Sequence, residues 1–147
     1  MRNSIKNYLS LVKFSHTIFA LPFALMGFFL GVTKRSAGSD THWWKLFVLV
    51  LLCMVFARNS AMAFNRWLDQ HIDALNPRTA VREIPSGIVP AKHALLFVII
   101  NVVCFIVCTW FINSICFFLS PVALFVILFY SYTKRLQDGV TWYWAWV

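Results

Sequence analysis

The stretch from residue 46 to residue 64 reads LFVLVLLCMVFARNSAMAF and is almost entirely apolar. Arg58 is its only charged residue. A helix needs about 20 largely apolar residues to cross the hydrocarbon core of a bilayer. A membrane β-barrel would instead show shorter segments of alternating polarity. The stretch therefore predicts a transmembrane helix.

Three further stretches have the same character, at residues 10–32, 94–112 and 115–133. The chain is 61% hydrophobic and 12% charged, with a mean hydropathy of +0.73. Soluble domains usually carry about 25% charged residues. We therefore expect an all-α, polytopic transmembrane helical bundle of about four spans, with membrane lipid around it. The first stretch is too long for a signal peptide and lacks a small-residue cleavage site, so we expect it to remain as a span.

Basic residues give the chain a net charge of +8, but they lie between the apolar runs and form no cluster suited to nucleic acid. Nine of them lie before or early in the first span, in the loop after the second span, or after the fourth span. Three lie in the loop between the first two spans. The positive-inside rule then predicts that the N-terminus and the long loop at residues 65–92 are cytoplasmic.

Two features inside the spans call for an interpretation. Cys53, Cys104, Cys108 and Cys116 all lie in apolar runs, so we interpret them as small buried hydrophobes and not as metal ligands. Arg58 should face the interior of the bundle and needs a partner there. Asn59 or a backbone carbonyl of the first helix could serve.

An acidic pattern follows the second span. Asn65, Asp69 and Asp73 recur every four residues, which places their side chains on one face of a helix. Like charges at this spacing destabilise a helix unless something lies between them, and Mg²⁺ prefers a few carboxylates together with phosphate oxygens. The spacing alone supports equally well a pair of solvated acids that balance Arg66 and Arg78.

The sequence that follows, NPRTAVREIPSG at residues 76–87, contains signals for a return of the chain. Pro77 should end the helix near Asn76. Arg78 and Arg82 can then reach back toward the acidic face, where guanidinium groups are suited to a diphosphate. These arginines could also serve only as topology markers. The sequence at residues 85–87, Pro-Ser-Gly, predicts a turn before the third span.

These motifs together resemble the UbiA family of intramembrane aromatic prenyltransferases. Residues 65–87 resemble its first aspartate-rich motif and loop, residues 16–24 (HTIFALPFA) its first helix, and residues 130–135 (YSYTKR) the end of its fourth. Glu83 is a departure, because many members have proline there. The likeness is strongest to the 4-hydroxybenzoate polyprenyltransferase branch and covers the N-terminal half of the fold.

The resemblance implies Mg²⁺-dependent transfer of a polyprenyl group from its diphosphate to an aromatic acid in quinone biosynthesis, in a bacterial inner membrane. It implies that Asn65, Asp69 and Asp73 hold the metal, with the two aspartates catalytic. The substrate-binding residues that it implies are Asn65, Arg78, Arg82, Lys13, Tyr130, Ser131, Lys134 and Arg135. His16 is expected to be a packed polar residue.

Length is the larger departure, because family members have about nine spans and a second aspartate-rich motif. Residues 1–135 correspond to the N-terminal half of the family domain, and residues 136–147 form an atypical aromatic tail. A frameshift, an early stop or a fragmentary gene would explain this, and we expect weak activity or none from the chain alone. Alternatives are a naphthoate-type acceptor, an inactive fragment, or a small non-enzymatic membrane subunit. A transporter has little support, because Arg58 is the only charge well inside a span.

Overall fold

The structure is a computed structural model that describes the backbone of residues 7–8, 10–12, 14–33 and 43–144. It also describes the side chains of these residues, except for residues 14–16 and 134–144. Lys13 lies outside the described residues, as do the side chains of His16, Lys134 and Arg135.

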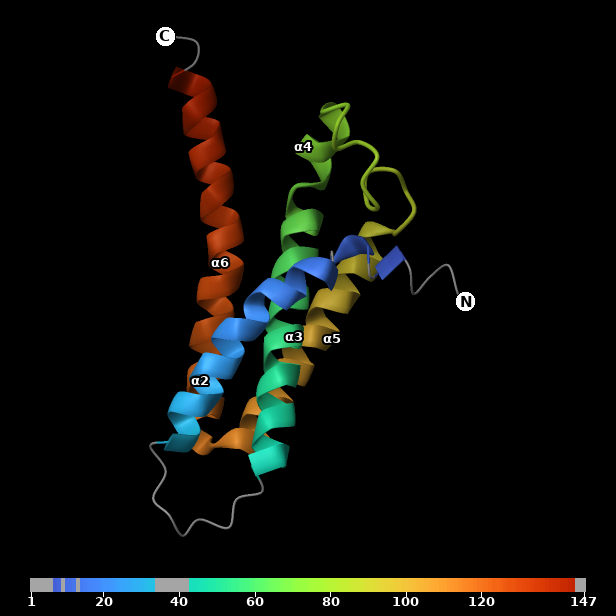
Figure 1. The fold of residues 1–147 in the computed structure, drawn as a ribbon. Helices are drawn as coiled ribbons and strands as arrows, with labels where there is room; N and C mark the ends of the chain where they lie inside the picture. The colour runs from blue at the N-terminus through green and yellow to red at the C-terminus, as the bar shows by residue number, and fades with distance from the viewer. Residues whose placement is uncertain (1–6, 9, 13, 34–42, 145–147) are drawn as a thin grey trace.

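The described chain is helical, as the apolar runs predict. A 3₁₀ helix, η1 (Phe14–Ala20), leads into α2 (Leu21–Thr33), and α3 (Trp43–Leu68) is followed by the short α4 (Gln70–Leu75). The last two helices are α5 (Ala91–Ile112) and α6 (Ser114–Trp144). Figure 1 shows α3, α5 and α6 running side by side, with α2 crossing them.

Among the described residues, three helical segments are long and apolar enough to cross a membrane: Trp43–Leu68, Ala91–Ile112 and Ser114–Thr133. They match the second, third and fourth expected spans. The first expected span contains a shorter apolar helix, Thr17–Thr33. Its regular α-helical part starts only at Leu21, and Pro22, which has no N–H to donate, follows directly.

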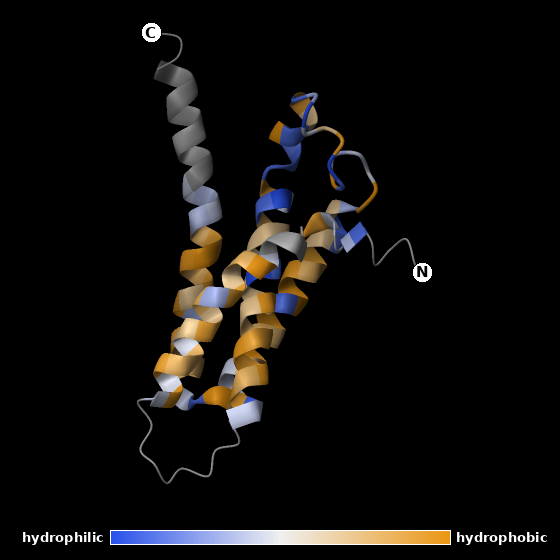
Figure 2. Cartoon of the chain, viewed as in Figure 1, coloured by the Kyte–Doolittle hydropathy of each residue, from blue (hydrophilic) through white to orange (hydrophobic). Residues whose placement is uncertain are grey.

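The outer surface of these helices is apolar, as expected for a lipid-facing bundle. Phe23, Val48, Ile99 and Phe125 are each exposed by about half or more of their surface. Figure 2 shows hydrophobic colour along the spans and hydrophilic colour concentrated at α4 and the loop after it. The polar end of the molecule is therefore the end where α3 finishes and α5 begins.

The buried core lies directly beneath this polar end. Its buried members come from the N-terminal segment, α3, the loop after α4 and α5, and they are Leu11, Val12, Ala63, Ile84, Val89, Ala94 and Val98. Ala63 and Ala94 are fully buried, and α3 packs more extensively on α5 than on any other helix. Small side chains at such positions let two membrane helices approach closely. The core therefore anchors the loop to the helices.

Several polar side chains within the spans donate hydrogen bonds to the backbone of their own helix. The Ser120 hydroxyl donates to the Phe117 carbonyl at 2.7 Å. That carbonyl would otherwise lack a donor, because Pro121 follows Ser120 inside α6 and has no N–H. The Asn101 amide donates to the Phe97 carbonyl in the same way, at 2.7 Å. Such bonds satisfy polar groups where lipid offers no partner.

Candidate active site at the end of α3

Asn65, Asp69 and Asp73 stack along one helical path at the end of α3. The amide N–H of Asp69 donates to the Asn65 carbonyl at 3.0 Å, and the amide N–H of Asp73 donates to the Asp69 carbonyl at 2.8 Å. These i to i+4 bonds continue across the junction between α3 and α4, so the three residues lie one turn apart on one side. The helix ends with α4 at Leu75, and Asn76 follows it, as Pro77 predicts.

Arg82 pairs with Asp73. Its Nη1 donates to both carboxylate oxygens of Asp73, at 2.7 Å each. Asp73 is only 6% exposed, whereas the Arg82 side chain is 33% exposed. The sequence predicts that Arg82 returns to the acidic face, and the structure places it there. It also shows that, in this structure, the guanidinium contacts one of the proposed metal ligands directly.

The loop that carries Arg82 is fixed by local hydrogen bonds. The Arg78 amide N–H donates to Asn76 Oδ1 at 3.0 Å, and the Thr79 hydroxyl donates to the Asp73 carbonyl at 3.0 Å. The predicted turn at residues 85–87 is present, with the Gly87 N–H bonded to the Ile84 carbonyl at 3.0 Å. Gly87 has φ of +76°, a conformation that favours glycine. The Arg78 side chain is exposed and forms no ion pair with any described residue.

A second ionic cluster, which the sequence reasoning missed, lies beside the first. Arg66 and Glu83 are largely buried, and Arg66 Nη1 lies 3.9 Å from Glu83 Oε2. The Ser10 hydroxyl donates to Glu83 Oε1. Arg66 Nη1 and Glu83 Oε2 are both buried without a hydrogen bond to any described residue. The only signal for this cluster in the sequence was Glu83 itself, as an acid at a position where proline is common.

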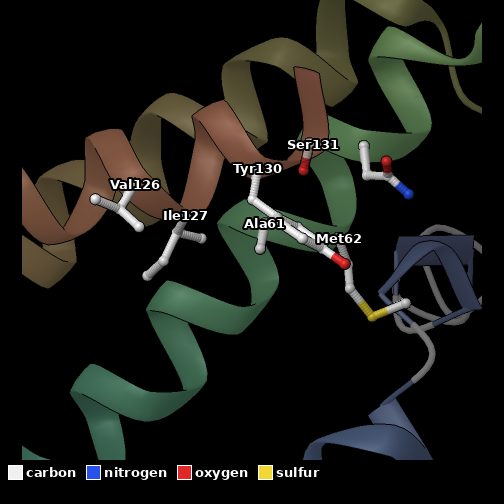
Figure 3. Close-up of a pocket in the computed structure, with 7 residues that line it drawn as sticks. Ala61, Met62, Val126, Ile127, Tyr130 and Ser131 are labelled. Carbon is white, nitrogen blue, oxygen red and sulfur yellow. The ribbon is translucent and has the colours of Figure 1, made fainter. Parts of the chain in front are cut away.

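A cavity of about 450 Å³ lies between α3 and α6, next to the acidic face. It is lined by Ala61, Met62, Asn65, Val126, Ile127, Tyr130 and Ser131. Figure 3 shows the Tyr130 side chain extending from α6 toward Ala61 and Met62 of α3. Asn65, Tyr130 and Ser131, which the sequence places far apart, therefore share one cavity. Lys134 and Arg135 follow on the backbone of α6.

Arg58 lies deeper along α3, and the structure excludes one of the two partners that the sequence suggested for it, Asn59. Its Nε is buried with no hydrogen bond to the described residues, and Asn59 Oδ1 is also buried without one. The expected Arg58–Asn59 pairing is therefore wrong. No ion pair reaches Arg58 from the described part of the chain. A cation within a span costs on the order of 2.5–3.5 kcal/mol on insertion scales, so a partner is required.

The donor set at the end of α3 suits a hard cation only in part. Two carboxylates and an amide oxygen are the ligand types that Mg²⁺ takes. Within the described residues no group of three or more His, Cys, Asp or Glu side chains could hold a metal. Mg²⁺ usually keeps waters and substrate phosphates among its ligands, so a set of this size fits an ion shared with a diphosphate.

Comparison with known proteins shows the family to which the chain belongs. The sequence model described as "UbiA prenyltransferase family" matches residues 15–146. The chain belongs to that family. The resemblance read from the sequence is thus confirmed. The matched residues and helix α6 both continue past residue 135, where the sequence suggested a boundary.

Relatives and a solved structure of the UbiA family extend the comparison. The chain is 30% identical over 93 residues to a 4-hydroxybenzoate octaprenyltransferase of Aliivibrio fischeri, covering 63% of this chain and 32% of that protein. It is 33% identical over 138 residues to a protoheme IX farnesyltransferase of Methylococcus capsulatus, covering 90% of this chain and 43% of that protein. The apo structure of a UbiA homolog from Aeropyrum pernix K1 superposes with a TM-score of 0.71 at 33% identity. That match covers 83% of this chain and 42% of the solved chain. The chain thus spans between about a third and less than half of these proteins.

Proposed function

We propose that this chain binds the diphosphate of a polyprenyl donor and belongs to an enzyme that transfers the prenyl group to an aromatic acid. The observation that carries the proposal is the stacking of Asn65, Asp69 and Asp73 beside the cavity between α3 and α6. An acidic face would repel a diphosphate unless a cation lay between them. The family relationship supports this prenyltransferase chemistry.

In this proposal Asn65, Asp69 and Asp73 hold Mg²⁺, and the ion, when bound, neutralises the leaving diphosphate as a Lewis acid. Arg82 and Arg78 approach from the loop and contact diphosphate oxygens, for which guanidinium groups are suited. Arg82 is already held at the acidic face by Asp73. We assign Lys13, Lys134 and Arg135 to the rim of the same site on the basis of the family motif.

The reaction breaks the allylic C–O bond of the donor, and the electron pair leaves with the diphosphate. A carbon of the aromatic ring then forms the new C–C bond, and the ring loses a proton to regain aromaticity. Charge placed in advance at the diphosphate lowers the barrier to the first step. The cavity walls, with Tyr130 and Ser131 facing Ala61 and Met62, would shape the space beside the reacting carbon.

The acceptor we propose is of the 4-hydroxybenzoate type, as the names of several relatives suggest. Other relatives are named protoheme IX farnesyltransferase, so acceptor choice in the family varies. A naphthoate-type acceptor is the alternative that the sequence leaves open. We further propose that the acidic end faces the cytoplasm, following the distribution of basic residues.

The first prediction concerns Asp69, and binding is the suitable readout because the chain spans less than half of its longer relatives. The purified chain in detergent should bind farnesyl diphosphate in the presence of Mg²⁺, and EDTA should abolish binding. Asp69→Asn should weaken binding about tenfold or more, because a charged ligand to the cation is lost. Isothermal titration calorimetry measures both.

Asp40→Asn is the matched control, since it removes one carboxylate that precedes α3 in the sequence. It should leave the affinity for farnesyl diphosphate unchanged. Magnesium-independent binding, or equal affinities for wild type and Asp69→Asn, would contradict the proposal. That result would favour a non-enzymatic membrane subunit in which the acids have no role.

A further inference from the structure

Aromatic side chains surround Lys45 at the end of the bundle opposite the acidic face. Trp43 and Trp44 begin α3, and their rings stack with centroids 4.2 Å apart. The ring of Trp44 contacts Phe47 at 5.9 Å, and the ring of Phe47 contacts the buried Phe28 of α2 at 5.2 Å. The cluster around Lys45 is therefore anchored to a second helix.

A third helix contributes rings to the same cluster, because the start of α3 and the end of α5 lie at one end of the molecule (Figure 1). Lys45 Nζ lies 5.8 Å from the ring centroid of Phe111 in α5. Trp110, the preceding residue, packs edge-on against Phe117 of α6 at 4.7 Å. Four of these side chains are more than half exposed, those of Trp43, Trp44, Trp110 and Phe111. Tryptophan gathers where a bilayer meets water, so these rings place Lys45 at the level of the lipid headgroups.

Lys45 has no acidic partner among the described residues. Its side chain is exposed and takes part in no ion pair with them. The acids whose side chains the structure describes all lie at the other end, and they are Asp69, Asp73 and Glu83. A ring 5.8 Å away attracts the ammonium group weakly and supplies no negative charge. The surface around Lys45 is therefore complementary to an anion.

The surface directly beneath Lys45 is apolar, which indicates an amphiphilic ligand. Val48 follows Lys45 by three residues, and Val107 precedes Phe111 by four. Each valine thus lies one turn farther into the span, on the same face of its helix. Both valines are about half exposed. A molecule that meets Lys45 and these valines together needs an anionic group with hydrocarbon chains attached to it.

We infer that Lys45 and the rings around it bind the headgroup of an anionic phospholipid. The phosphate pairs with the ammonium group, the rest of the headgroup contacts the tryptophan rings, and an acyl chain lies along Val48 and Val107. The attraction of one lysine to an anionic bilayer surface corresponds to a change of about fivefold in affinity. This surface is at the opposite end from the candidate active site, so the inference does not depend on the proposed function.

Native mass spectrometry of the purified chain in detergent tests this inference. The probes are phosphatidylglycerol and phosphatidylcholine with the same acyl chains. Lys45→Gln is compared with Lys92→Gln, which loses an exposed cation at the start of α5 and so has the same net charge. Lys45→Gln should bind phosphatidylglycerol about fivefold more weakly than Lys92→Gln, and the two should bind phosphatidylcholine equally. Equal affinities of the two variants for phosphatidylglycerol would overturn the inference.

Two controls separate the charge of Lys45 from other effects. Lys45→Arg, which keeps the charge, should bind phosphatidylglycerol like wild type, and a fivefold loss in this variant would count against the inference. Glycerophosphoglycerol, the same headgroup without acyl chains, should not displace the lipid. Displacement would show a site for soluble anions and would refute the assignment to a lipid.

A measurement on wild type decides the question if Lys45→Gln does not fold. Acetylation of lysine side chains is followed by mass spectrometry in nanodiscs of either lipid. Phosphatidylglycerol should slow the labelling of Lys45 relative to that of Lys92, because the bound headgroup covers the Lys45 ammonium group. The same ratio of labelling rates in both lipids would overturn the inference.

Discussion

At the scale of single residues, Glu83 holds the loop onto the helices. It accepts a hydrogen bond from Ser10 and lies 3.9 Å from Arg66, so it links the N-terminal segment, α3 and the loop. Its neighbour Arg82 contacts Asp73. Glu83 therefore fixes the position from which Arg82 reaches the acidic face.

Glu83→Gln should loosen this loop. The neutral amide keeps one acceptor for Ser10 but removes the opposite charge with which the buried Arg66 forms its ion pair, at a cost of about 1–3 kcal/mol. Hydrogen exchange measured by mass spectrometry should show faster exchange in residues 78–89 than in wild type. Lys92→Gln, which neutralises an exposed charge at the start of α5, should show wild-type exchange. Unchanged exchange in Glu83→Gln would mean that the core beneath holds the loop unaided.

Sequence reasoning worked at this scale only where the signal is local. Pro77 ends the helix at the expected place, and the turn at residues 85–87 is the one that its residues favour. The contact between Ser10 and Glu83 joins residues 73 positions apart, so no local pattern could reveal it. For Arg58 the sequence indicated that a partner is needed, but Asn59, the one candidate taken from its neighbours in the sequence, is wrong.

At the scale of helices, the close packing of α3 on α5 depends on small side chains. Ala63 and Ala94 are fully buried, and Ser60 is fully buried one turn before Ala63. The apolar runs predicted the extent of these helices well, because burial in lipid requires little more than length and hydropathy. They did not predict which faces meet, because hydrophobic residues cover all sides of both helices.

Ala63→Leu should destabilise this pair of helices. A larger side chain at a fully buried site forces the helices apart, and overpacking of this kind costs about 1–3 kcal/mol. Unfolding in mixed micelles with increasing SDS should occur at lower SDS for Ala63→Leu. Val48→Leu, at a lipid-exposed position of the same helix, should unfold like wild type. Equal unfolding midpoints for both variants would show that the packing at Ala63 tolerates the added volume.

At the scale of the whole molecule, polar groups gather at one end. The acidic face, the ion pairs and the loop all lie where α3 ends and α5 begins, whereas the junction between α5 and α6 lies at the opposite end (Figure 1). The fold class and the polar end followed from the sequence, since both depend on composition. The predicted number of spans agrees less well with the structure, because the first predicted span is divided between a 3₁₀ helix and an α-helix.

The orientation in the membrane is testable with single cysteines in a cysteine-free background. Ser86→Cys should react with a membrane-impermeant maleimide only after the cells are permeabilised, because the basic loop is expected in the cytoplasm. Asn113→Cys, exposed at the other end, should react in intact spheroplasts. The reverse labelling pattern would place the acidic face outside and would exclude cytoplasmic substrates.

The pairing of Asp73 with Arg82 has a thermodynamic consequence for ligand entry. Asp73 loses most of its hydration when the chain folds. A cation that binds later therefore displaces little water from this carboxylate. Both bonds to Asp73 come from a single guanidinium nitrogen. The other nitrogens of the Arg82 guanidinium make no hydrogen bond to that carboxylate. Binding of a cation would therefore replace Arg82 as the partner of Asp73, while the folded loop and helices stay in place.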